Sequence, residues 1–412
     1  MFFGFGLLIF AEEFHPQIYT FELKKGFTMG SIDYKTSQAK IHEKRDLTLF
    51  KFEVNCGNID KDICDKANKE SSELASLMEK VLDIKRNIVI LIQFISFCET
   101  VCNNETIARS GPSTYFALSR NPVILYPQSL VKQLANNSNS LAYSKYDAVI
   151  NFNSDSDRLY YETFEDGSQN NQYSFKFIVS HECMHGLGVV TSFDEYIDIS
   201  QFEAIQTGKS NYPVTASSKL LSPAPNNNNL NKKIKRDLNF LPKGKVESFS
   251  NFQFINLYDT CLVDARTNFK VFDIFMKYFY NSPTPLPIQT LFQASSLYKG
   301  ATLRYAIMFD TGSEQFPMDT TFANFSSGSS MSHLDQGLGP GSLDELMWSI
   351  AQHDKTIDLK GSSSSSWGYY QLKMLQTMGY PLKIDPETVP KSISYGLRHI
   401  CSIYILIIHV IN

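Results

Sequence analysis

Residues 174–191 read SFKFIVSHECMHGLGVVT, and this stretch decides how the chain is interpreted. His181 and His185 are four residues apart, and Glu182 directly follows the first histidine. A helix turns once in 3.6 residues, so the two imidazoles project from one face and can bind one metal ion. Glu182 lies one residue further round the helix, where it can reach a water molecule on that ion and act as a general base.

The flanking residues predict where this helix packs and where it ends. Phe175 and Ile178 share a face with His181, so the apolar side of the helix is expected to face a core. Gly186 and Gly188 follow the second histidine, and glycine commonly ends a helix by adopting a left-handed conformation. We therefore expect a metal-binding helix that stops at these glycines.

A catalytic Zn²⁺ ion needs a third protein ligand and one open position. The compact pattern H-E-x-x-H-x-x-G-x-x-H is matched as far as Gly188, but Thr191 stands at its last position, and threonine is not a zinc ligand. The third ligand must therefore come from elsewhere in the chain. The candidates are two downstream histidines and two nearby carboxylates: His333, His353, Asp194 and Glu195.

His333 has the most suitable surroundings among these candidates. It lies in the segment GSSMSHLD (328–335), whose small residues allow the backbone to approach a site closely. Asp335 is a candidate to accept the second N–H of a ligand imidazole, and Met347 is a candidate to support the metal from below. If His333 is the third ligand, its ring nitrogen should lie within about 4 Å of the other two ligand nitrogens.

Several short motifs together resemble a family of secreted zincin-like metallopeptidases of microbes and fungi. The motifs occur in the family's order: HECMHGLG (181–188), GSSMSHLD (328–335), ELM (345–347) and LKMLQTMGYP (372–381). The resemblance implies an α+β, zincin-like fold in which a twisted, mostly antiparallel sheet packs on the active-site helix. It also implies zinc ligation by His181 and His185 and catalysis by Glu182. Val189 departs from the phenylalanine that the family prefers, a change that affects packing rather than chemistry.

The composition excludes two broad classes of protein. The 412 residues include 38 Lys+Arg and 42 Asp+Glu, a net charge of −4 that provides no basic surface for nucleic acid. Apolar residues make up 43% and charged residues only 19%, so the bulk of the chain can bury a core and is not intrinsically disordered.

The cysteines and glycosylation sequons favour secretion. Four of the seven cysteines, which fall within 47 residues, are expected to form two disulfides, with a zinc site as the alternative: Cys56, Cys64, Cys98 and Cys102. Three sequons make the chain a candidate glycoprotein and begin at Asn104, Asn136 and Asn324. We expect an extracellular protein.

The chain is predicted to form one domain over residues 21–385, with its two halves meeting near residue 190. Residues 1–20 resemble a truncated signal segment, and residues 206–236 are rich in turn formers and resemble a loop insertion. Residues 386–412 are expected to be a tail, whose apolar end is too short to span a membrane stably.

The pattern of apolar residues predicts four further elements within this domain. They are helices over 71–85 and 262–280 and strands over 87–97 and 146–152.

The sequence as a whole predicts a secreted, zinc-dependent metalloendopeptidase that acts on a protein or peptide substrate. One alternative is a non-catalytic surface or adhesion protein, although the intact Glu182 argues against it. The other alternative is a metal-dependent hydrolase of a non-peptide substrate, because the chemistry of such a site does not name the bond that it cleaves.

Overall fold

The structure is a computed structural model. It describes eleven segments of the chain: 20–21, 48–98, 106–117, 123–134, 143–162, 172–191, 254–273, 303–320, 329–338, 342–350 and 367–391. The predicted insertion over 206–236 lies outside these residues, as do residues 1–19 of the expected signal segment and residues 392–412 of the expected tail.

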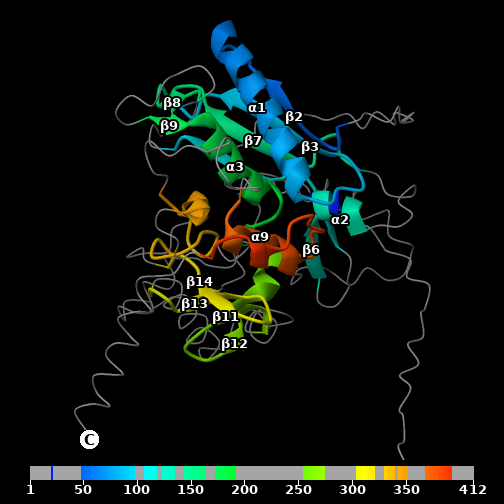
Figure 1. Cartoon of the computed structure of the whole chain (residues 1–412), viewed down its shortest axis with the longest axis vertical. Helices are drawn as coiled ribbons and strands as arrows, with labels where there is room; N and C mark the ends of the chain where they lie inside the picture. Colours follow the sequence, from blue (N-terminus) through cyan, green and yellow to red (C-terminus); the bar gives the residue numbers. More distant parts are fainter. Residues whose placement is uncertain are drawn as a thin grey trace, which may run out of the picture.

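A four-stranded mixed sheet in the order β2-β3-β7-β4 forms the framework around the histidine helix (Figure 1). Its strands are β2 (Phe50–Asn55), β3 (Ile88–Ile95), β7 (Ala148–Asn153) and β4 (Ala108–Pro112). The first three run parallel, and only the edge strand β4 is antiparallel. β3 and β7 have the continuous apolar sequence typical of buried parallel strands, and the predicted strands over 87–97 and 146–152 are confirmed.

The helices α1 (Lys61–Val81) and α3 (Phe175–Gly186) contact each other and the same sheet, so they lie on one face of it. α1 starts ten residues before the predicted helix over 71–85. Asp60 explains the earlier start, because its side chain accepts a hydrogen bond from the Asp62 amide at 2.7 Å and caps the helix. Leu74 and Met78 supply its buried face.

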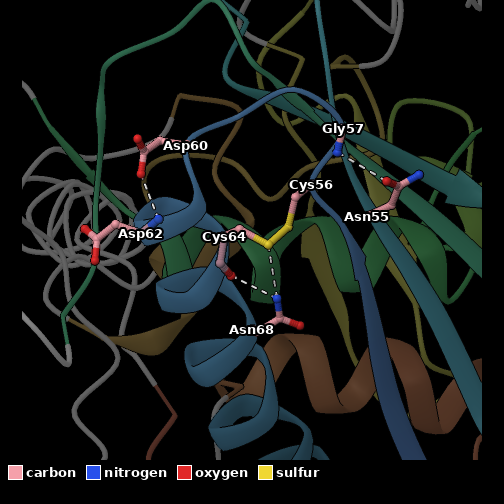
Figure 2. The surroundings of a disulfide bond; sticks show 7 residues. All are labelled: Asn55, Cys56, Gly57, Asp60, Asp62, Cys64 and Asn68. Carbon is pink, nitrogen blue, oxygen red and sulfur yellow. Dashed lines mark hydrogen bonds between the residues drawn. A yellow bond between two sulfur atoms is a disulfide. The ribbon is translucent and has the colours of Figure 1, made fainter.

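A disulfide between Cys56 and Cys64 ties the end of β2 to the first turns of α1. Figure 2 shows Asn68 one helical turn further on, where its amide donates to the Cys64 carbonyl at 2.9 Å. This pairing removes both sulfurs from any zinc site. Cys98 is also disulfide-bonded, whereas Cys102 lies outside the described residues.

Another four-stranded sheet lies at the other end of the molecule in Figure 1. It has the order β12-β11-β13-β14, and all its strand pairs are antiparallel. Its strands are β12 (Phe269–Lys270), β11 (Leu262–Asp264), β13 (Ile307–Asp310) and β14 (Gln315–Pro317). The helix predicted over 262–280 is therefore wrong at its start, where β11 and β12 form a hairpin. Asn268, with φ 57°, forms the turn between them.

The remaining strands form one further four-stranded sheet and one two-stranded sheet. The strands are β1 (Thr20–Phe21), β5 (Tyr115–Ala117), β6 (Val123–Pro127), β8 (Leu159–Tyr160), β9 (Tyr173–Ser174) and β10 (Phe254–Asn256). The helices are α2 (Gln128–Leu134), η4 (Leu257–Cys261), η5 (Leu343–Met347), α9 (Tyr369–Met378) and η6 (Pro386–Thr388). One hydrophobic cluster contains residues of the β2-β3-β7-β4 sheet, of the β12-β11-β13-β14 sheet, of α3 and of α9.

The expected zincin-like fold with a mostly antiparallel sheet is wrong. The chain is α+β, but the described residues form several small mixed sheets, and the sheet under α3 pairs three of its four strands in parallel. The parallel pairs β2–β3 and β3–β7 join segments that lie far apart in sequence. In the described part of the chain, no helix combines the length and apolar character that a membrane crossing needs.

Candidate metal centre

The helix α3 ends at the glycines that the sequence predicts, and a serine caps its start. Ser174 caps its start by accepting a hydrogen bond from the Phe177 amide at 3.1 Å. The helix ends at Gly186, and Gly188 follows with φ 101°, a conformation that favours glycine. At Gly186 a β-carbon would lie 2.8 Å from the Ala148 β-carbon, so this glycine lets the helix lie close against β7.

Three imidazoles converge beside this helix. His181 and His185 come from one face of α3, and His333 comes from the loop that precedes η5. Each pair of their Nε2 atoms is 3.2 Å apart. Among the described residues, these three form the group whose donor atoms lie close enough together to hold one metal ion. The separation is within the 4 Å expected for His333, while ligation itself stays a prediction.

Each imidazole is oriented by a backbone carbonyl at its other nitrogen. The Nδ1 atoms of His181, His185 and His333 lie 2.5, 2.7 and 2.9 Å from the carbonyl oxygens of Leu346, Val189 and Ser329, respectively. A carbonyl only accepts, so each Nδ1 donates its proton. Each Nε2 of a neutral ring then presents its lone pair to the shared centre.

The loop that carries His333 is held by backbone hydrogen bonds to two neighbouring segments. The His333 carbonyl accepts from the Asp319 amide at 2.7 Å, and the Asp319 carbonyl accepts from the Met331 amide at 2.9 Å. On the other side, the Leu334 amide donates to the Met347 carbonyl at 2.8 Å. His333 is therefore fixed between the segment after β14 and the end of η5.

Glu182 is 6% exposed, and its buried Oε2 atom has no hydrogen-bond partner among the described residues. Burial raises the pKa of this carboxyl to about 8, because the charged form loses solvation. An unpaired buried oxygen is costly to maintain unless it has another use. Its position, one residue after a candidate ligand, is where a proton acceptor for a hydrolytic water would be required.

Removal of water also keeps the three imidazoles neutral. Burial lowers the pKa of His185 to about 3, with a further contribution from His181. Burial lowers the pKa of His333 well below its ordinary value, and the other two rings lower it further. Desolvation likewise lowers the pKa of His181, which keeps part of its surface exposed. Neutral imidazole is the form that binds a metal ion.

A comparison with known protein families places the chain in one of them. The SPBPB7E8-like family matches residues 33–396, which is most of the sequence. The chain belongs to the SPBPB7E8-like family. No curated protein and no solved structure matches it.

In this SPBPB7E8-like chain, the two residues expected to support the site differ in what they do. Asp335 does not orient an imidazole in the structure: its carboxylate accepts from the Arg304 side chain at 3.0 and 3.1 Å and from the Gly337 amide at 2.7 Å. Met347 is fully buried, and its carbonyl anchors the His333 loop through the Leu334 amide. Leu346, its neighbour, orients His181.

The other residues considered as ligands fall into two groups. Asp194, Glu195 and His353 lie outside the described residues. Thr191 is described, and its hydroxyl donates a hydrogen bond to the Asp259 carboxylate at 2.5 Å. Cys183, between Glu182 and His185, is fully buried, as expected of a packing residue.

Two sets of contacts were not predicted from the sequence of this SPBPB7E8-like protein. The first is the set of orienting carbonyls, which no side-chain pattern can reveal because every residue has one. The second is the segment 256–259, which contacts the residues around the site. An Asn-x-Tyr-Asp sequence beside a strand has polar side chains at spacings that favour caps and turns, but it names no partner.

Proposed function

We propose that the chain is a zinc-dependent hydrolase that cleaves peptide bonds. The observation that supports it is the convergence of the Nε2 atoms of His181, His185 and His333, 3.2 Å apart. Glu182 comes from the same helix as the first two, and none of the described residues hydrogen-bonds its buried Oε2. Three nitrogen donors suit Zn²⁺ and related transition metals, whereas Mg²⁺ and Ca²⁺ prefer oxygen ligands.

The donor chemistry fits a bound zinc ion. The three imidazoles would hold it through Nε2, and the backbone carbonyls at each Nδ1 would keep the rings in that orientation. When bound, Zn²⁺ supplies Lewis acidity and lowers the pKa of a water molecule toward about 7. An ion with three protein ligands keeps a position open for substrate or water, as catalytic zinc sites do.

Glu182 is the residue proposed to move the proton. Its Oε2 accepts a proton from the attacking water and passes it to the departing amine nitrogen, so that the peptide C–N bond breaks and one water is consumed. Without a metal ion, burial raises the pKa of this carboxyl to about 8, and the positive charge of a bound ion would favour its charged, proton-accepting form. Glu182 itself is only 6% exposed, so the protein shields its carboxyl from most of the bulk water.

We also propose that the protein acts outside the cell. Disulfides such as Cys56–Cys64 form and persist mainly in oxidising compartments, and the three sequons are consistent with that route. A substrate of protein or peptide nature follows from the motif resemblance rather than from the geometry, which is equally able to hydrolyse other acyl bonds.

The experiment that tests the proposal is a cleavage assay on a peptide mixture, read by mass spectrometry, with the protein before and after chelator treatment. Cleavage that stops on chelation and returns with Zn²⁺ is the expected result. Zinc-dependent hydrolysis of simple esters without peptide cleavage would indicate a non-peptide substrate. Tight Zn²⁺ binding without any hydrolysis would indicate a non-catalytic protein, and no Zn²⁺ binding would overturn the proposal.

A further inference from the structure

A short segment of the chain, β10 and η4, contacts the point where the chain leaves the histidine helix. The side-chain amide of Asn256 donates to the Val190 carbonyl at 3.2 Å. Asp259 accepts a hydrogen bond from the Thr191 hydroxyl at 2.5 Å. Two consecutive residues after α3 are thus held by two side chains that lie only three positions apart.

The same segment also contacts the loop that carries His333. The Tyr258 hydroxyl donates to the Met331 carbonyl at 2.8 Å. Thr191 completes the connection, because its amide donates to the Ser332 hydroxyl at 3.0 Å. Met331 and Ser332 directly precede His333 in sequence. The helix exit and the His333 loop are therefore joined both directly and through η4.

Three of these hydrogen bonds are shielded from water, which makes them costly to break. The residues that form these three are each at most 5% exposed: Tyr258, Asp259, Thr191, Met331 and Ser332. The bond between Asn256 and Val190 is only partly buried. Met331 also has φ 66°, a left-handed conformation that is strained for a residue other than glycine. Such strain persists only where the surroundings impose it, and Tyr258 bonds the carbonyl of this very residue.

We infer that Asn256, Tyr258 and Asp259, together with Thr191 and Ser332, position His333 against His181 and His185. We call these five residues the clamp. The inference rests on the proposed metal site, which is where the position of His333 has a consequence. Clamp residues are positioning residues, because they act on His333 through the adjacent backbone.

The clamp gives Thr191 a specific role. It stands at the spacing where the compact H-E-x-x-H-x-x-G-x-x-H pattern has its third ligand. In this chain Thr191 instead bonds the loop that carries His333, the proposed third ligand. His333 lies 142 positions further along the sequence. A side chain with one donor and a backbone amide suffice for that purpose, whereas a histidine there would have no hydroxyl to offer Asp259.

A matched pair of variants at Thr191 tests the inference. Thr191→Val keeps the shape of the side chain and removes the hydroxyl, whereas Thr191→Ser keeps the hydroxyl. Zn²⁺ affinity is measured on the folded proteins by competition with a chromophoric chelator. We expect Thr191→Val to bind Zn²⁺ about 10–100-fold more weakly, the usual loss when a group that orients a ligand is removed. Thr191→Ser should remain close to the wild-type affinity.

Two further variants separate positioning from general stability. Tyr258→Phe removes only the hydroxyl that holds Met331, and it should weaken Zn²⁺ binding in the same way as Thr191→Val. Gly312→Ala strains a turn far from the clamp in sequence, at φ 83°, and should lower thermal stability without changing Zn²⁺ affinity. Unchanged affinity in both Thr191→Val and Tyr258→Phe would overturn the inference, as would failure of both to fold.

Crystal structures of the metal-free proteins distinguish failure of this inference from failure of the proposed function. If the wild type binds no Zn²⁺, the proposed function fails, but the separation of the His181 and His333 Nε2 atoms still reports on the clamp. We expect 3.2 Å in the wild type and in Thr191→Ser, and a displaced His333 in Thr191→Val. An undisplaced His333 in Thr191→Val would overturn the inference whether or not zinc binds.

Discussion

The helix α3 and the loop around His333 contribute to the same cluster of imidazoles, but they are built in different ways. His181 and His185 are placed by the turn of one helix, so their relative position depends on hydrogen bonds within a dozen residues. His333 is placed by contacts with segments near Asp319, Met347 and Tyr258, none of them adjacent to it in sequence. Two of the proposed ligands can thus be encoded locally, while the third depends on the assembled fold.

The largest expected effect is the loss of hydrolysis when Glu182 on α3 is replaced. Glu182→Gln keeps the size of the side chain and removes its ability to accept a proton. We expect hydrolysis to fall about 10²–10⁴-fold, while Zn²⁺ affinity stays close to that of the wild type because Glu182 is not a proposed ligand. Peptide cleavage and metal content are measured on the same samples. Hydrolysis retained above about one part in a hundred would exclude Glu182 as the base.

The next effect compares the two regions directly. If both supply ligands, His185→Ala and His333→Ala should weaken Zn²⁺ binding to a similar extent, by at least ~100-fold, more than is typical for loss of an orienting group. Competition titration with a chelator measures both. A large loss for His185→Ala with little change for His333→Ala would mean that the loop does not contribute a ligand, and the helix would need another partner.

A smaller effect is expected at Gly188, where the chain leaves α3. Gly188 has φ 101°, and a β-carbon there would lie 2.8 Å from the Pro127 Cγ atom. Gly188→Ala should therefore destabilise the protein by about 1–3 kcal/mol through backbone strain and the clash. Gly312→Ala is the control, because it has φ 83° but nothing within 4 Å of the added carbon. Chemical denaturation measures both, and equal losses would show that the contact with Pro127 is unimportant.

The remaining effect is a pH dependence of the metal-free protein. The pKa of His185 is about 3 and that of His333 is well below normal in the folded state, so between about pH 3 and 6.5 the unfolded chain binds protons that the folded chain does not. Stability should then fall as the pH drops below about 6.5, by up to about 1.4 kcal/mol per pH unit for each imidazole.

Glu182 has the opposite dependence. Its pKa of about 8 in the folded state means that stability falls as the pH rises from about 4.5 through 8. Thermal unfolding of metal-free wild type and His333→Ala between pH 5 and 7 separates the histidine contribution, since the variant should show the shallower decline toward acid. Parallel curves for the two proteins would show that His333 is not buried as a neutral base.

The contrast between the two regions also explains what the sequence could predict. The spacing of His181 and His185 and the glycines after the helix depend on interactions within one element, so they follow from helix geometry alone. The apolar runs of β3 and β7 are similarly local. The family motif around His333 identified a residue that the structure does bring to the other two.

Features that depend on distant pairing were not predictable in the same way. The parallel order of β2, β3 and β7 was missed because an apolar run does not state its partner or direction. The β11–β12 hairpin was interpreted as part of a helix, because short apolar runs fit a helix as well as a strand. The turn at Asn268 was not recognised. Asp335 was expected beside an imidazole, yet Arg304 competes for its carboxylate from 31 residues away.

The proposed zinc site is tested most directly by a crystal structure of the protein grown with Zn²⁺, with anomalous diffraction recorded on both sides of the zinc absorption edge. We expect one zinc peak per chain, about 2.0–2.1 Å from the Nε2 atoms of His181, His185 and His333. The Oε2 atom of Glu182 should lie near the ion without binding it. A zinc ion bound by Asp194 or Glu195 in place of His333, or no anomalous peak between the three imidazoles, would contradict the proposed site.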